Sequence, residues 1–189
     1  MKTPPDTLLR PVLIGTLAAW MALVVASGAF AAMAFPAVRD LAPVIPSMPI
    51  MTESHWKVVA GVPAQRNFEV VQAAGWLLGA CSILLALACR GRPGFLAFVQ
   101  WCAHLGAIAM LAFIQFEVVN PMNDLSARLH EAMRRGDLDA AHAIDRVFKA
   151  IHGFATPLMS VMVVAILVAM VVALIRTARP SFEAGNQAP

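Results

Sequence analysis

Four long uncharged runs dominate the pattern of hydrophobic and polar positions along the chain. They cover about residues 11–35, 70–89, 93–117 and 150–176, and charged residues bound each run. A helix needs about 20 mostly apolar residues to cross the hydrocarbon core of a bilayer. The pattern therefore predicts an all-α integral membrane protein, a single membrane domain over residues 1–189, with the lipid bilayer as its partner. Spans that alternate in direction predict a four-helix up-down bundle.

The segments between the first three runs carry turn signals. Pro36 is expected to end the first span, and the proline-rich stretch that follows, through Pro63, is expected to be an irregular loop with His55 at its surface. Residues 90–94 (RGRPG) predict a tight basic turn. The second and third spans should therefore form an antiparallel hairpin.

The third and fourth runs are separated by a charged segment. Asn120-Pro121 predicts a turn, and residues 125–135 predict an extra amphipathic helical segment between spans 3 and 4, which Gly136 ends. Asp137 or Asp139 can cap the next helix. The tail over about 180–189 has no apolar pattern and is expected to be disordered.

Small residues recur along the first and second runs. In the first run they repeat at helix-neighbour spacing (Gly15, Ala19, Ala22, Ala26, Gly28, Ala32), which indicates either a face that packs on another span or simply an alanine-rich helix. Gly75 and Gly79 have the spacing of a close helix contact. The first run is longer than the 7–15 apolar residues of a signal peptide, so we expect it to stay in the protein.

Composition and charge give predictions about the partners, the membrane and the orientation of the protein. The chain is 60% apolar and 13% charged with a net charge of +3, and its scattered basic residues exclude a nucleic-acid partner. Abundant Ala and Arg indicate a GC-rich bacterial source, hence a bacterial inner membrane. The density of Arg90, Arg92, Arg176 and Arg179 near span ends predicts that both termini are cytoplasmic. The two long loops hold eight basic residues, against six on the side of the termini, so the raw count of basic residues favours the reverse orientation. Nine acidic residues in the same loops offset them.

Polar residues within the runs are the candidate site. Residues from three spans fall at one depth near the outer end of the bundle, with a glutamate just above them, and predict a binding site with His152 inside the bundle. The alternative is a set of hydrogen bonds that ties helix ends together. These candidates are Gln72, Gln115, Glu117, His152 and Thr156, with Glu69 above them. His104 joins Gln100 and Gln115 in a polar seam near mid-membrane, as a packing residue or a proton relay.

No enzyme motif appears in the sequence, and the three cysteines have no metal-binding spacing. The sequence predicts no cofactor and no metal. It favours a non-enzymatic role, structural or interaction-like, with small-molecule binding at the outer end and with a homo-oligomer as a further option. The alternative is a haem- or copper-linked redox or oxygenase-like membrane protein. His104 and His152 differ in depth by about 20 Å, which disfavours one haem bound between them.

Three short motifs carry a family resemblance. Phe35-Pro36, Asn120-Pro121 and Phe148-x-x-x-His152-Gly153, with the order of the spans, are similar to a bacterial four-span domain of unknown function related to transmembrane protein 205. That resemblance implies no particular activity. This chain has Thr156-Pro157 where the family tends to have asparagine. Pro121-Met122-Asn123 also resembles the anthrone-oxygenase-like four-span family, which implies an oxidative enzyme.

Overall fold

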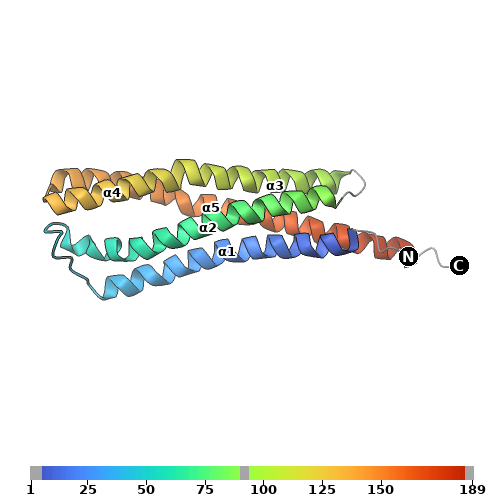
Figure 1. Ribbon diagram of the computed structural model, residues 1–189, viewed down its shortest axis with the longest axis horizontal. Coiled ribbons are helices and arrows are strands. Elements are labelled where there is room, and N and C mark those ends of the chain that lie inside the picture. The colour runs from blue at the N-terminus through green and yellow to red at the C-terminus, as the bar shows by residue number, and fades with distance from the viewer. Residues whose placement is uncertain (1–5, 90–93, 186–189) are drawn as a thin grey trace. The chain divides into compact units, whose positions relative to one another are not determined.

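The chain folds into long helices. The computed structural model describes the backbone of residues 6–89 and 94–185 and the side chains of residues 8–89 and 94–178. The basic turn expected at residues 90–94 falls almost wholly outside this part. The helices are α1 (Asp6–Asp40), α2 (His55–Ala88), α3 (Phe95–Phe113), α4 (Asn120–Arg135) and α5 (Leu138–Gly185), with a short 3₁₀-helix η1 (Thr52–Ser54) and a π-helix η2 (Ile114–Val119) (Figure 1).

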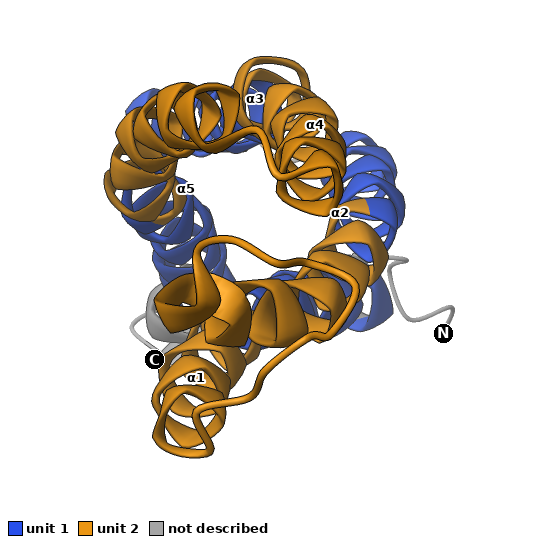
Figure 2. Cartoon of the chain, turned by 90° about the vertical axis from the view of Figure 1, so that its left-hand side faces the viewer, with its two compact units in different colours: residues 1–24, 73–111, 160–189 blue, residues 25–72, 112–159 orange. Residues whose placement is uncertain are grey.

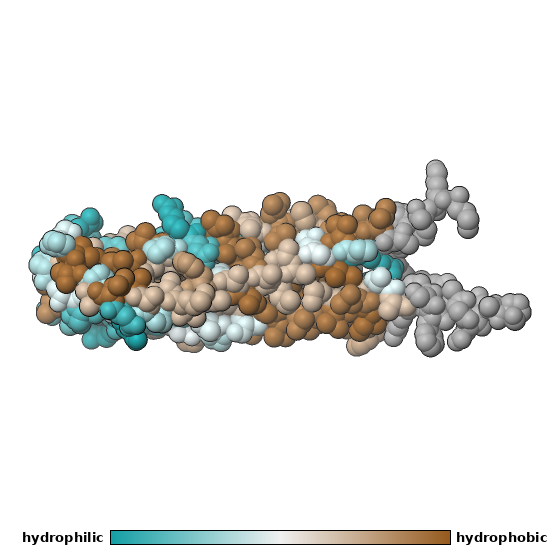
Figure 3. Space-filling view, turned by 90° about the horizontal axis from the view of Figure 1, so that it is seen from below, coloured by the Kyte–Doolittle hydropathy of each residue, from teal (hydrophilic) through white to brown (hydrophobic). Residues whose placement is uncertain are grey.

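Four helical segments are long and apolar enough to cross a membrane. They are Leu8–Asp40, Thr52–Ala88, Phe95–Arg135 and Leu138–Ala178. Large apolar side chains such as Leu84, Phe98 and Val164 are exposed on them, as expected of surfaces that meet lipid. Hydrophobic side chains cover much of the face shown in Figure 3. Hydrophilic side chains gather mainly at its left-hand end, where Figure 1 shows the 41–54 connection and α4. The prediction of an all-α chain with four membrane-spanning helices is confirmed.

The described residues divide into two compact units, and each of α1, α2 and α5 contributes to both (Figure 2). Unit 1 comprises residues 1–24, 73–111 and 160–189. Its core includes Leu13, Leu17 and Trp20 of α1, which follow one another at helical spacing. An ideal Cβ on Gly75 would lie 3.3 Å from the Trp20 indole nitrogen, and one on Gly79 would lie 3.2 Å from its ring. The two glycines therefore leave room for the Trp20 ring, which supports the predicted close helix contact.

The small-residue face of α1 points away from the rest of the chain. Gly15, Ala19, Ala22 and Ala26 are exposed, and nothing lies within 4 Å of an ideal Cβ on Gly15 or Gly28. The larger side chains on the opposite side of the helix fill the core instead. Of the two interpretations of this repeat, packing on another span does not occur among the residues that the structure describes.

Unit 2 comprises residues 25–72 and 112–159. Its core joins the 41–54 connection to α4 and α5 through Met48, Met51, Ala132, Met133 and Ala141. The amphipathic segment expected between spans 3 and 4 is thus present as α4, and it buries its apolar side here. This core fixes the connection, although proline prevents regular secondary structure along much of it.

His55 holds the same connection in place. Its side chain is fully buried, so the expectation of a surface residue is wrong. The Ile45 backbone N–H donates to His55 Nδ1 at 2.9 Å, and His55 Nε2 lies 3.1 Å from the Ile50 carbonyl oxygen. An accepting Nδ1 leaves the proton on Nε2, which donates to Ile50. One imidazole therefore satisfies two backbone groups of an irregular segment.

Two helices contain prolines at which the sequence predicted a helix end or an irregular loop. α1 runs past Pro36 to Asp40, and α2 begins at His55 with Pro63 inside it. A proline removes one backbone donor and disturbs one turn, a cost that a long, well-packed helix can bear. The irregular loop is therefore much shorter than predicted.

Asn120-Pro121 does not form a turn, and this prediction is also wrong. α3 passes into the π-helix η2, where the Asn120 backbone N–H donates to the carbonyl oxygen of Gln115, five residues earlier, and α4 follows directly. A π-turn is wider than an α-turn, which relieves the contact between a proline ring and the preceding turn. The chain therefore stays helical from Phe95 to Arg135.

The start of α5 agrees with the sequence, but its end does not. Gly136 ends α4 with φ of 74°, and the Asp137 side chain caps α5 by accepting from the Ala140 N–H at 3.0 Å. The backbone then stays helical through Pro180 to Gly185, so the predicted disorder is wrong for residues 180–185. Extending an existing helix carries no nucleation cost.

Candidate functional site

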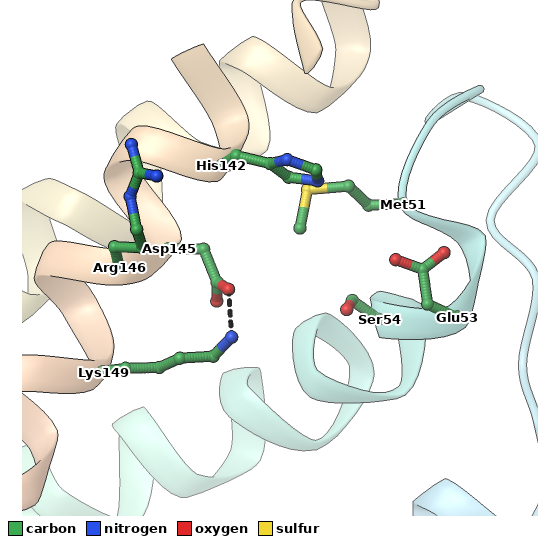
Figure 4. Close-up of a pocket in the computed structure, with 7 residues that line it drawn as sticks. All are labelled: Met51, Glu53, Ser54, His142, Asp145, Arg146 and Lys149. Carbon is green, nitrogen blue, oxygen red and sulfur yellow. Dashed lines mark ion pairs between the residues drawn. The ribbon is translucent and has the colours of Figure 1, made fainter. Parts of the chain in front are cut away.

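A polar pocket in unit 2 lies between η1 and the first turns of α5. It has a volume of about 290 Å³ and is lined by Met51, Glu53, Ser54, His142, Asp145, Arg146 and Lys149. Figure 4 shows Glu53 and Ser54 on one side, facing Asp145 and Lys149 across the opening. These residues precede the apolar runs of their own helices, so the pocket lies outside the predicted hydrocarbon region. Its volume is near the lower end for small-molecule sites.

The spacing of residues along α5 brings the side chains of one face of this helix to the pocket. His142, Asp145 and Lys149 share one face of α5 because they are three and four residues apart. Asp145 is buried and forms an ion pair with Lys149, four residues later. A buried carboxylate needs such a partner, so Lys149 is held in position beside the opening.

An unusual backbone conformation at Met51 positions the η1 side of the pocket. Met51 adopts the left-handed region with φ of 55° and ψ of 38°, which is uncommon for a residue with a side chain. The Met51 carbonyl accepts from the Ser54 N–H at 2.8 Å, and the Met51 side chain is buried in the core of unit 2. Burial thus maintains a turn that directs Glu53 and Ser54 to the pocket.

The pocket has charges of both signs. Glu53 and Asp145 contribute carboxylates, Arg146 and Lys149 contribute cations, and His142 adds an imidazole to the lining (Figure 4). Ser54 adds a hydroxyl that can donate and accept. A small molecule with one cationic and one anionic group could meet both kinds of partner here.

The residues predicted from sequence lie elsewhere, and most of their contacts are local. The Gln115 amide donates to Asn120 at 2.8 Å, and Glu69 accepts from Arg66 at 3.0 Å and Gln65 at 3.2 Å. Each of these partners is within five residues of the predicted residue. These contacts do not connect one span to another.

His152 is exposed, so the prediction that it lies inside the bundle is wrong. Its ring stacks on Phe148, one turn earlier, with centroids 6.2 Å apart. Glu117 and Thr156 are also exposed. The turn-by-turn counting that placed these residues at one depth gave no information on which way each side chain points.

Gln72, Gln100 and His104 are buried as predicted. Gln72 is 7% exposed, and its Oε1 has no hydrogen-bond partner among the described residues. His104 is 1% exposed, with Nδ1 2.8 Å from the Gln100 carbonyl oxygen, and no described residue bonds to its Nε2. Gln115, the third residue of the predicted seam, is only half-buried and lies within η2.

Most residues of the pocket could not be selected from the sequence. Glu53, Ser54 and His142 are ordinary polar residues of loops and helix starts. Only the spacing of Asp145 and Lys149, four residues apart, could have indicated an ion pair on one helix face. Their convergence depends on the fold of the 41–54 connection onto α5, which no local pattern encodes.

Within residues 8–89 and 94–178, no group of three or more His, Cys, Asp or Glu side chains could hold a metal ion. Comparisons of the chain with family models, with curated proteins and with solved structures find no match. The helices themselves define the class: this is a multi-pass integral membrane protein.

Proposed function

We propose that this protein has a non-enzymatic binding role in the membrane, and that it binds a small zwitterionic molecule in the unit 2 pocket. The pocket's volume of about 290 Å³ and its two signs of charge support the proposal. Glu53 would meet the cationic group of the ligand, while Lys149 and Arg146 would meet its anionic group. The lining residues precede the apolar runs, so a water-soluble ligand could reach them.

Calorimetric titration of the full-length protein in detergent tests this role. The probes are glycine and 4-aminobutyrate, two zwitterions that differ in charge separation, with butyrate and butylamine as single-charge analogues. We expect one of the zwitterions to bind more tightly than either analogue, because only it can meet both signs of charge. Equal binding of all four probes would contradict the proposal.

Two variants connect that binding to the pocket. Glu53→Gln should weaken zwitterion binding about fivefold to tenfold, because a charge-assisted hydrogen bond becomes a neutral one. Asp139→Asn is the matched control, since Asp139 is exposed on the first turn of α5 and does not line the pocket. Unchanged binding in Glu53→Gln would place the ligand elsewhere.

A redox role is the second candidate, and His104 favours it. With Nδ1 beside the Gln100 carbonyl, the neutral ring carries its proton on Nδ1, and Nε2 presents a free lone pair in the core of unit 1. Such a nitrogen can bind a haem iron or a copper ion. The absorbance spectrum and metal content of the purified protein decide between the roles, because a Soret band or stoichiometric copper would favour redox chemistry.

We also propose a bacterial inner membrane as the location, with both termini in the cytoplasm. The basic residues near the span ends of the sequence support this orientation. A homo-oligomer is an expectation from sequence that light scattering of the purified protein can check.

A further inference from the structure

The lining of the unit 2 pocket carries a balanced set of charges. Glu53 and Asp145 are acidic, whereas Arg146 and Lys149 are basic. Asp145 and Lys149 already form an ion pair with each other. A ligand with one group of each sign and no net charge therefore matches this lining better than an anion or a cation does.

Glu53 and Arg146 are the two charges that stay available to a ligand. Both side chains are exposed, and neither has an ion pair or a hydrogen bond to another residue within 8–89 and 94–178. Glu53 belongs to η1 and Arg146 to α5, so they come from different sides of the pocket (Figure 4). A guanidinium group can form two parallel hydrogen bonds with a phosphate or a carboxylate. Arg146 thus suits the anionic group of the ligand, and Glu53 suits its cationic group.

The lining also indicates the kind of cation. Sites for quaternary ammonium groups enclose the cation in aromatic rings, and the described lining of this pocket contains no Phe or Trp. The Glu53 carboxylate and the Ser54 hydroxyl instead offer oxygen acceptors to the N–H donors of a primary ammonium. The pocket therefore favours a primary amine over a trimethylated one.

Two of the predicted spans end near the level of this pocket. Lys149, which lines the pocket, directly precedes the fourth apolar run. Phe35 ends the first apolar run and packs edge-on against Trp56, with ring centroids 6.3 Å apart. Trp56 follows the pocket residue Ser54 by two positions, and tryptophan favours the headgroup level of a membrane. A lipid headgroup is therefore a ligand that the membrane itself can bring to the pocket.

We propose that this pocket binds a phosphoethanolamine group, and that phosphatidylethanolamine supplies it. This inference rests on the binding role proposed above and names the ligand of the same pocket. Glu53 and Ser54 accept from the ammonium group, and Arg146 donates to the phosphate. The volume of about 290 Å³ is near the lower end for small-molecule sites, which suits a headgroup. Soluble glycerophosphoethanolamine has the same chemistry, so the test separates the two sources.

The test uses the full-length protein in a neutral detergent. Phosphatidylethanolamine, phosphatidylcholine or glycerophosphoethanolamine is added separately. Native mass spectrometry reports the retained compound, and thermal unfolding reports stabilisation. We expect phosphatidylethanolamine to be retained and to stabilise the protein more than phosphatidylcholine does, because a trimethylammonium group has no N–H to donate to Glu53 or Ser54.

Four variants connect this binding to the pocket. Glu53→Gln and Arg146→Gln should each weaken the apparent affinity for phosphatidylethanolamine about tenfold, by the loss of a charge-assisted hydrogen bond. Asp139→Asn and Arg39→Gln are the matched controls for the loss of one acidic and one basic charge. Both control residues are exposed and neither lines the pocket, so phosphatidylethanolamine binding should stay unchanged in them.

The possible outcomes separate the parts of the proposal. Equal retention of phosphatidylethanolamine by the wild type and by both pocket variants would overturn the site. Equal effects of phosphatidylcholine would overturn the recognition of a primary ammonium. Binding of glycerophosphoethanolamine without phosphatidylethanolamine would overturn the lipid source. Binding of glycine or 4-aminobutyrate without either phosphoethanolamine compound would overturn this inference alone, whereas no binding of any of these zwitterions would also contradict the proposed function.

Discussion

At the scale of single residues, His55 shows how a polar side chain can organise an irregular segment. A buried imidazole that accepts from one backbone group and donates to another replaces the regular hydrogen bonds that prolines prevent. The glutamate and serine of the candidate pocket follow within this segment, so the shape of the pocket depends on His55 without direct contact.

His55→Ala should therefore destabilise unit 2. It leaves the Ile45 N–H and the Ile50 carbonyl without their partner, at a cost of about 2–4 kcal/mol for two partly buried groups. Thermal unfolding in detergent and limited proteolysis within residues 41–54 measure the effect. His142→Ala is the matched control, since His142 is exposed, and equal loss in both variants would contradict a special role for His55.

The cap of α5 gives a smaller prediction at the same scale. Asp137→Ala removes the acceptor of the Ala140 N–H and should cost about 1 kcal/mol of unfolding free energy. Asp139→Ala, two residues later, should cost clearly less, because no hydrogen bond of its side chain is described at the start of the helix. A larger loss in Asp139→Ala would show that Asp139 is the cap.

At the scale of helices, contacts in unit 1 depend on which face of each helix is small. Gly75 and Gly79 of α2 leave space for Trp20, whereas the small residues of α1 are exposed. Spacing alone made both repeats candidates for packing. Among the described residues, only the repeat of Gly75 and Gly79 packs on another helix, because the large ring of Trp20 fills the space beside the two glycines.

Gly79→Leu should consequently disrupt unit 1. Even a Cβ at this position meets Ile108 and lies 3.2 Å from the Trp20 ring, so a full leucine forces core side chains to shift, at about 1–3 kcal/mol. Gly15→Leu, at a position with nothing within 4 Å, should be neutral or stabilising. Thermal unfolding of the two variants tests this, and an equal loss of stability would contradict the described packing.

Hydropathy was sufficient to predict the number and approximate position of the helices, because the cost of leaving backbone groups unpaired in lipid makes long apolar runs helical. It could not predict the helix ends. Pro36 was taken as a helix end, Pro63 as part of an irregular loop and Pro121 as part of a turn, yet helices continue through all three. For Pro121, the nearby π-turn gives the reason, and such a turn has no simple sequence signal.

The candidate site was harder to predict than the helices for a related reason. Depth along a helix follows from counting residues, but side-chain direction depends on local phase and on the partner helices. His104 was correctly placed in the interior, since a polar residue in the middle of an apolar run has few other positions available. His152 lies near the predicted boundary of the hydrocarbon core, where exposure is also stable, and counting residues did not distinguish an inward-facing side chain from an exposed one.

At the scale of the whole molecule, the orientation in the membrane remains the most consequential prediction. It decides which compartment the unit 2 pocket opens to. Basic residues near the ends of the spans predict that both termini face the cytoplasm.

Alkaline phosphatase fusions test this orientation in a bacterial host, because the enzyme is active only after export. A fusion after Asn186 should give low activity, and a fusion after Ala42, in the connection between α1 and α2, should give high activity. The reverse pattern would place the pocket in the cytoplasm.

The π-helix η2 has a consequence for how the gene can change. A π-turn holds one residue more than the α-helix around it, so η2 corresponds to a single surplus codon between those for Ile114 and Val119. Deleting that codon would restore an ordinary α-turn, and the remaining residues would turn through about the same angle as the six of η2. The later residues of α4 would keep their direction, so Met133, now 1% exposed, would stay in the core of unit 2. Deleting a codon from the regular helix before η2 would instead rotate every later residue of that helix by about 100°.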